Sequence, residues 1–182
     1  MHLTIFIVNI YICKTMVNKS QILDRNGIDQ KINRLAWQVY ENNVKEDEIV
    51  LVGIFGRGEV IAIELFKVLK QISAFKIKLG VITLDKDNPY QKETKINLDL
   101  SDYANKVVIL IDDVLNSGKT LMYASKHFLN TPLIKLSTVA LVDRNHNRFP
   151  IRADYVGLSL ATTLQEYISV SLDGDSQGIY LC

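Results

Sequence analysis

Two adjacent carboxylates stand directly before a loop of small polar residues in the middle of this chain. Asp112 and Asp113 end the apolar run VVILI, and they are followed by Asn116, Ser117, Gly118, Lys119 and Thr120. Nucleotide-binding P-loops share the Gly-Lys-Thr ending, but Asp113 stands where such a loop requires its first glycine. A carboxylate there would repel the β-phosphate of a nucleotide, which argues against an ATPase or GTPase.

The same residue types suit a sugar phosphate. A loop that leads from a strand into a helix presents free backbone N–H groups, two hydroxyls and a positive helix end to one phosphate monoester. Carboxylates are hydrogen-bond acceptors, and a neighbouring pair matches the two hydroxyls of a ribose. We therefore expect a phosphate on residues 116–120 and a diol on Asp112 and Asp113. The simpler alternative is a strand that merely ends in polar residues.

The elements that must position this loop alternate along the chain. Apolar and β-branched runs predict strands at 48–55, 76–84, 106–114 and 136–145, and residues 153–160 and 167–172 are expected to finish the same sheet. Apolar residues at helical spacing predict helices within 22–43, at 59–72 and at 120–129. This alternation indicates an α/β fold with a doubly wound, mostly parallel sheet.

Ligands bind at the carboxyl ends of the strands in such a sheet. Three loops leave those ends, at 56–58, 113–120 and 143–146, and we expect the chemistry to lie between them. The polar run 85–94 has few apolar anchors and is expected to form a mobile loop or hairpin.

Length and composition fit one domain. The chain has 182 residues, and its net charge of +1 argues against a protein whose main task is to coat nucleic acid. Cys13 and Cys182 lie at opposite ends, a spacing that suggests neither a metal site nor a disulfide scaffold, and the cytoplasm is the simplest location. Residues 1–15 are apolar but too short to span a membrane. We interpret them as an extension whose place in the native protein is open, or alternatively as an edge strand, before a single domain at 16–182.

Three segments resemble the type I phosphoribosyltransferase family. VILIDDVLNSGKT at 108–120 is similar to the family's signature for phosphoribosyl pyrophosphate (PRPP), which is specific for this superfamily. LVGIFGRGEVIAIELFKVL and LVDRNHNRFPIRADYVG resemble its PyrR-like group, whose members are both uracil phosphoribosyltransferases and regulators of a pyrimidine operon. The similarity runs from about Ile22 to Leu172 and implies a parallel α/β sheet with a mobile hood loop, here residues 85–94.

The resemblance implies a role for each matched residue. The expected reaction transfers the phosphoribosyl group of PRPP to uracil and gives UMP and pyrophosphate, with UMP bound as product or effector. Mg²⁺ is expected to bridge sugar and pyrophosphate beside Asp112 and Asp113. The catalytic residues are expected to be Asp112, Asp113 and Arg57. The 5-phosphate is expected on Asn116, Ser117, Gly118, Lys119 and Thr120, and the pyrophosphate on Gly56, Arg57 and Gly58. The base pocket is expected at Asp143, Tyr155 and Val156, with Tyr155 stacked on the pyrimidine and the Val156 backbone reading its edge. Relatives of this kind assemble as dimers or larger, which implies a homo-oligomer.

Some positions depart from the family pattern. Asn116 stands where purine-salvage members carry an Asp that is a candidate general base, and because an amide cannot accept a proton, the purine interpretation is disfavoured. The pyrimidine group usually has tyrosine at this position, so Asn116 departs from that group too. Lys119 stands where arginine is usual in the pyrimidine group, and Lys86 is the nearest cation to a missing hood arginine. Weak or altered transfer, or transfer to another base, are the alternatives.

The family's RNA-binding surface is only partly kept. Its character is retained by Arg34, His146 and Arg152. Its other histidine and basic positions are occupied by Trp37, Asn42, Asn147 and Leu158. Because each lost cation removes a phosphate contact, we expect no sequence-specific RNA binding. A regulator that binds RNA or a nucleotide and has little catalysis is the alternative.

Overall fold

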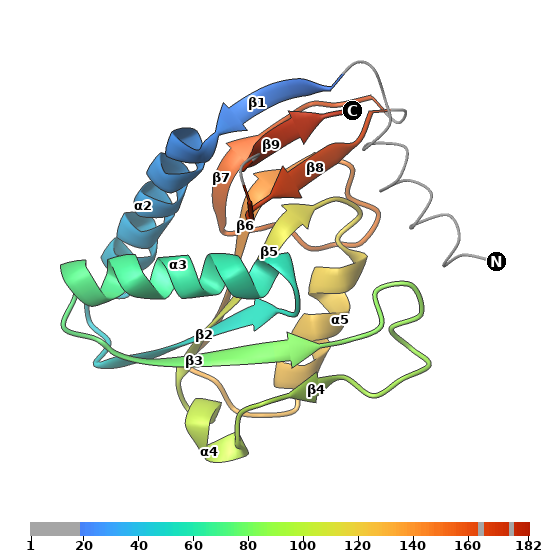
Figure 1. The fold of residues 1–182 in the computed structure, drawn as a ribbon. Coiled ribbons are helices and arrows are strands. Elements are labelled where there is room, and N and C mark those ends of the chain that lie inside the picture. Colours follow the sequence, from blue (N-terminus) through green and yellow to red (C-terminus); the bar gives the residue numbers. More distant parts are fainter. Residues whose placement is uncertain (1–18, 164–165, 175–176) are drawn as a thin grey trace.

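The computed structural model describes residues 19–163, 166–174 and 177–182 (Figure 1). The segment 1–15, for which we weighed an extension against an edge strand, lies outside the described residues. A six-stranded sheet has helices on both faces, and a three-stranded sheet packs beside it.

The large sheet has the strand order β4-β3-β2-β5-β6-β7. Its strands are β2 (Glu48–Ile54), β3 (Lys76–Thr83), β4 (Lys95–Ile96), β5 (Val107–Leu115), β6 (Lys135–Asp143) and β7 (Tyr155–Ser159). All neighbouring pairs are parallel except β3 and β4. β2 and the first half of β5 are continuous apolar runs because helices cover both of their faces. The predicted doubly wound, mostly parallel sheet is confirmed.

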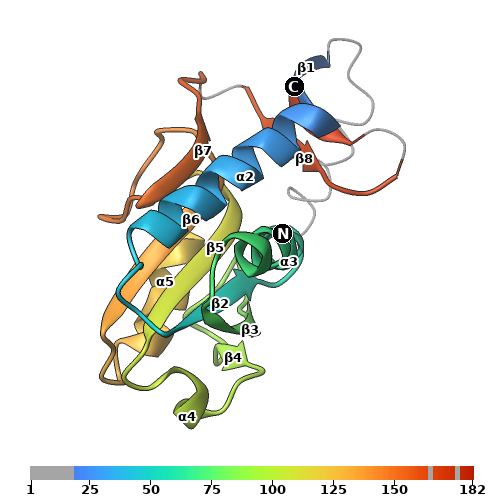
Figure 2. The same ribbon diagram turned by 90° about the vertical axis from the view of Figure 1, so that its left-hand side faces the viewer.

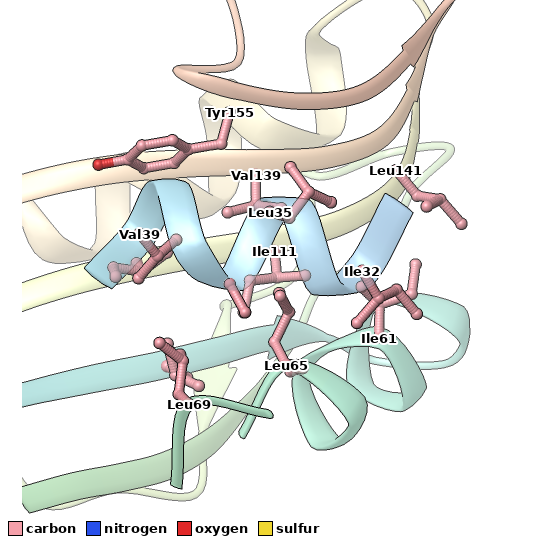
Figure 3. Close-up of a cluster of buried hydrophobic side chains, with 14 of the residues drawn as sticks. Ile32, Leu35, Val39, Ile61, Leu65, Leu69, Ile111, Val139, Leu141 and Tyr155 are labelled. Atoms are coloured by element: carbon pink, nitrogen blue, oxygen red, sulfur yellow. The ribbon is translucent and has the colours of Figure 1, made fainter. Parts of the chain in front are cut away.

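Helices α2 (Arg25–Glu41) and α3 (Arg57–Ile72) cover one face of this sheet, as Figures 1 and 2 show. Asp24 caps α2, because its side chain accepts a hydrogen bond from the N–H of Gly27. The apolar stripes of the two helices meet over β5, β6 and β7. Figure 3 shows this core: Ile32, Leu35, Val39, Ile61, Leu65, Leu69, Ile111, Val139, Leu141 and Tyr155.

Helices α5 (Lys119–Phe128) and α4 (Leu100–Tyr103) cover the opposite face. Leu121 and Phe128 of α5 pack in the same cluster as Val108 and Leu110 of β5. Because successive side chains of a strand point to opposite faces, β5 contributes to both cores. The same alternation continues to the end of β5, so the side chains of Asp112 and Asp113 point to opposite faces of the sheet.

The small sheet consists of β1 (Ser20–Asp24), β9 (Gly178–Leu181) and β8 (Ile168–Ser171), paired antiparallel in that order. The expectation that residues 167–172 finish the large sheet is therefore wrong, whereas 153–160 do join it as β7. β8 pairs instead with β9, and its Val170 packs in the core beneath α2 and α3. Cys182 is disulfide-bonded, although its place in the sequence did not suggest it.

The polar run 85–94 connects β3 to β4, which pair antiparallel with Ile82 opposite Ile96. It therefore forms the end of a hairpin, one of the two expected forms, while its mobility stays a prediction. No helix in the described part of the chain is long and apolar enough to cross a membrane.

Candidate active site

The loops that follow β2, β5 and β6 lie together, because these neighbouring parallel strands end at the same edge of the sheet. Two contacts join them. Arg57 Nε lies 2.9 Å from Asp113 Oδ2, and the N–H of Arg144 donates to the Leu115 carbonyl at 3.0 Å. The structure thus brings together the three loops at which we expected the chemistry.

Asp112 and Asp113 form a buried acid pair, with exposed fractions of only 5% and 7%. Asp113 faces Arg57, while Asp112 points to the other face, where Lys86 Nζ lies 3.9 Å from its Oδ1. The N–H of Asp113 donates to Asp112 Oδ1 at 3.0 Å. The pKa of Asp112 is raised to about 7, mainly by burial and to a smaller extent by the negative charge of Asp113. A ligand that brings positive charge or hydrogen-bond donors to this pair relieves both effects.

Arg57 is the first residue of α3 and has two partners. Besides its ion pair with Asp113, its Nη1 donates to the carbonyl of Val170 on β8 at 2.7 Å. The small sheet therefore holds the arginine next to the acids, a contact that no sequence pattern signalled because the partners lie far apart in the chain. The Arg57 side chain is still 42% exposed, so a phosphate oxygen can reach it.

Gly56 and Gly58 let the start of α3 approach the acid pair. Gly56 has a φ of 97°, a conformation that L side chains rarely adopt. A Cβ at Gly58 would lie 2.6 Å from the Ile111 carbonyl oxygen and 3.2 Å from Asp112 Cα. The positive end of α3 is consequently packed directly on the end of β5.

The loop 116–118 leads from β5 into α5, whose N-cap is Gly118 with a φ of 81°. The first N–H groups of α5, like those of any helix, lack an intrahelical acceptor, and Gly118 has no side chain to cap them. The Ser117 hydroxyl accepts one of them, the N–H of Lys119, at 3.3 Å. The remaining open N–H groups at a helix N-terminus are suited to a phosphate.

The hairpin end 85–94 contacts the start of α5, next to the loop 116–118. Lys119 Nζ donates to the Asp87 carbonyl at 2.7 Å, and Lys86 approaches Asp112. Asp85 stabilises the turn, since its Oδ1 accepts the N–H groups of Asp87 and Asn88 at 3.1 and 3.0 Å. Lys86 of this hairpin and Arg57 at the start of α3 therefore each lie next to one acid of the pair.

The residues expected to line the base pocket are not all brought together. Asp143 ends β6 at the site, and its carboxylate accepts the N–H of Asn145 at 2.8 Å. Tyr155 begins β7 and is opposite Val139, whereas Ser159 is opposite Asp143. Tyr155 therefore lies four residues, or about 13 Å, before the edge of the sheet, at roughly 3.3 Å per residue.

Tyr155 is buried in the core under α2, and burial raises the pKa of its phenol. The ring packs against core side chains, and its stacking on a base stays a prediction. The Val156 carbonyl is also occupied, since Arg34 Nη2 donates to it at 3.0 Å. Of the three expected residues, Asp143 lies at the carboxyl edge of the sheet, and the base-pocket roles of Tyr155 and Val156 stay predictions.

These features define a class of protein. The family model described as phosphoribosyl transferase domain matches residues 18–173, and the chain belongs to that family. A hypoxanthine phosphoribosyltransferase of Trypanosoma cruzi has the same fold, with a TM-score of 0.73 at 16% identity over 89% of this chain and 95% of the other.

The group within the family follows from curated relatives. The Bifunctional protein PyrR of Clostridium acetobutylicum is 39% identical over 176 residues, which cover 89% of this chain and 97% of the relative. The protein of the same name from Clostridioides difficile is 37% identical over 167 residues, with 86% and 93% covered. The resemblance to the PyrR-like group is confirmed.

Proposed function

We propose that the protein transfers the phosphoribosyl group of PRPP to uracil and releases UMP and pyrophosphate. The observation that carries the proposal is the buried pair Asp112 and Asp113, which lies between the starts of α3 and α5. A ligand held on these acids has anion-binding groups on either side. PRPP matches this order, because its ribose diol lies between a pyrophosphate and a 5-phosphate.

Each group of PRPP has a proposed partner. The ribose hydroxyls donate to Asp112 and Asp113, and the 5-phosphate accepts from residues 116–120. Arg57 and the N–H groups beside Gly56 and Gly58 face the pyrophosphate. As pyrophosphate leaves, negative charge grows on its oxygen, and Arg57 stabilises that charge from a position already set by its bond to β8. The hood 85–94 is proposed to close over the site and exclude water.

The acid pair fits Mg²⁺, which proteins bind through one or two carboxylates together with substrate phosphates. No group of three or more metal-ligating side chains occurs in the described part of the chain, so the substrate would complete the shell around Asp112 and Asp113. Bound Mg²⁺ supplies charge neutralisation at the pyrophosphate. Asp112, with its pKa raised to about 7, would release its proton when the cation arrives.

A pyrimidine is the proposed acceptor. The neutral amide of Asn116 follows the acid pair where a purine transferase of this family would place a proton-accepting carboxylate. Asp143, at the carboxyl end of β6, is the proposed base-pocket residue. Uracil is favoured among pyrimidines because curated relatives over most of the chain belong to the PyrR-like group.

The test is a transfer assay with radiolabelled uracil, PRPP and Mg²⁺, with hypoxanthine as the competing base. We expect UMP as the product and its loss when the metal is removed with EDTA. Absence of UMP from a folded protein that binds PRPP would exclude uracil and leave another base or a regulator without catalysis.

The ribose assignment has its own test. Asp112→Asn with Asp113→Asn should abolish PRPP binding, measured by calorimetry, and leave the protein folded. Asp47→Asn with Asp173→Asn changes two exposed acids and is the matched control, for which we expect wild-type affinity. Unchanged PRPP affinity in the first double variant would refute the assignment.

The name Bifunctional protein PyrR of the relatives favours a second candidate, a regulator that binds RNA or a nucleotide. Two residues that could contact RNA, however, form hydrogen bonds with backbone carbonyls of the protein itself. Arg34 Nη2 donates to the Val156 and Gly157 carbonyls at 3.0 and 2.6 Å, and His146 Nε2 lies 2.6 Å from the Thr162 carbonyl. We therefore propose no sequence-specific RNA binding; submicromolar, sequence-dependent retention of pyrimidine leader RNA in a filter assay would overturn this.

Location and assembly are proposed on the family resemblance alone. We propose a cytoplasmic protein that forms a homodimer or a larger oligomer. Light scattering on the purified protein tests the assembly, and a monomer at assay concentration would contradict it.

A further inference from the structure

The segment 144–151 runs beside the phosphate loop and contacts it at several points. The N–H of Arg144 donates to the Leu115 carbonyl at 3.0 Å. Further along, the N–H groups of Arg148 and Phe149 both donate to the Ser117 carbonyl, at 2.9 and 3.0 Å. The family resemblance connected the surrounding motif, residues 141–157, with a base pocket and an RNA surface, but the contacts of residues 144–151 are with the phosphate loop.

The two bonds to Ser117 orient the next peptide N–H. In a planar trans peptide the C=O and the following N–H point in opposite directions. The N–H of Gly118 is therefore turned away from segment 144–151 and toward the open side of the loop. Outside helices and strands, no backbone hydrogen bond of the described residues uses the N–H of Gly118 or Thr120 as a donor. These N–H groups are available to a phosphate oxygen.

Side-chain packing holds Gly118 from the same side. A Cβ at Gly118 would lie 2.8 Å from Ile151 Cγ2 and 3.5 Å from Phe149 Cβ, so the two side chains fill the space behind the loop. The Phe149 ring also meets Tyr123 of α5 edge-on, with 6.3 Å between the ring centroids. Segment 144–151 thus contacts both the loop and the helix that the loop begins.

The segment is anchored on its other side as well. The Arg144 guanidinium is buried, with Nε donating to Thr162 Oγ1 at 3.2 Å and Nη2 donating to the Glu166 carbonyl at 2.6 Å. His146 contacts the Thr162 carbonyl. A segment held on both sides keeps the loop in its binding geometry before a ligand arrives, which lowers the ordering cost of binding.

We propose that residues 144–151 form a brace that positions the 5-phosphate loop, with the N–H groups of Arg148 and Phe149 and the side chain of Ile151 as its positioning groups. The inference rests on the proposed function, because it takes the loop 116–120 as the site of the 5-phosphate. The brace acts through Ser117 and Gly118. Its loss should weaken binding of the 5-phosphate and leave binding of pyrophosphate, on the Gly56–Gly58 loop, unchanged.

The experiment measures the binding of two probes by calorimetry: ribose 5-phosphate and magnesium pyrophosphate. Phe149→Pro removes both the ring and the N–H, and Phe149→Ala, which removes only the ring, is the matched control. We expect ribose 5-phosphate to bind about three- to tenfold more weakly to the proline variant than to the alanine variant, the loss typical of one hydrogen bond. Both variants should bind magnesium pyrophosphate as the wild type does.

Equal affinity of the two variants for ribose 5-phosphate would overturn the brace. An equal loss for both probes would also overturn it, because that result shows a general distortion. Wild-type protein that binds magnesium pyrophosphate but not ribose 5-phosphate would refute the phosphate assignment of the proposed function itself, and the brace with it. If only the brace proposal is wrong, the wild-type protein still binds both ribose 5-phosphate and magnesium pyrophosphate.

A double-mutant cycle tests the packing of Ile151 against Gly118 without introducing a proline. Gly118→Ala should weaken ribose 5-phosphate binding, because the new Cβ meets Ile151 Cγ2. Ile151→Ala removes that methyl group, so the loss caused by Gly118→Ala should be smaller in the Ile151→Ala background. Additive losses would overturn the contact as a positioning device.

Discussion

Asparagine at position 112 keeps the shape of the aspartate side chain and removes its charge. In the folded chain, burial and the neighbouring Asp113 raise the pKa of Asp112 from 3.8 to about 7. The folded state therefore holds this proton more tightly than the unfolded chain does. The resulting contribution to stability is fully present below pH 3.8 and is lost as the pH rises through about 7.

The size of the effect follows from the gap between the two pKa values. At 1.36 kcal/mol per pKa unit, a rise from 3.8 to about 7 corresponds to an upper bound of about 4 kcal/mol. Between about pH 5 and about pH 8 the wild type should lose about 2 to 3 kcal/mol relative to a variant that cannot titrate there. Asp112→Asn should thus be more stable than the wild type at high pH, with a smaller difference at low pH.

Urea unfolding of wild type, Asp112→Asn and the exposed control Asp47→Asn across this pH range measures the effect. The control should follow the wild-type curve. The gain in stability of Asp112→Asn should accompany loss of PRPP binding, as expected where a site keeps a destabilising group for its ligand. Parallel pH curves for Asp112→Asn and wild type would refute the reasoning.

Three other substitutions test the surroundings of the acid pair. Gly58→Ala would place a Cβ 2.6 Å from the Ile111 carbonyl, and the displaced loop should lower kcat/KM for PRPP about a hundredfold in the uracil assay; unchanged kinetics would contradict the close packing. Lys119→Met removes the bond to the Asp87 carbonyl, so protease cleavage within 85–94 should become faster, and an unchanged cleavage rate would show that the bond does not hold the hood. Leu65→Ala empties a fully buried position and should lower the free energy of unfolding by about 2 to 5 kcal/mol in urea; a loss below about 1 kcal/mol would be inconsistent with the packing under α2.

The order of elements was enough to predict where the acids lie. Parallel strands end at the same edge of a sheet, so local patterns that identify β5 also place Asp112 and Asp113 at its carboxyl end. The loop 116–118 and the start of α5 were predictable for the same reason, because each is continuous with β5 along the chain.

The position of Tyr155 was not predictable in this way. Its place depends on the register between β6 and β7, which pairs it with Val139 and buries the ring under α2. A motif in the sequence shows which residues are adjacent, but not how far along a strand the edge of the sheet lies. The pairing of β8 with β9 was missed for a related reason, because a short apolar run is compatible with either sheet.

The sequence by itself determined the fold class, the family and the places of the acid pair and the loop 116–118 at the end of β5, because these depend on periodicity and on residues close together in the chain. Tertiary structure decided which distant groups act on them. Only folding brings the Val170 carbonyl to Arg57 and places the N–H groups of Arg148 and Phe149 on Ser117. Such contacts depend on packing and strand pairing between distant segments, and the same packing buries Asp112 and raises its pKa.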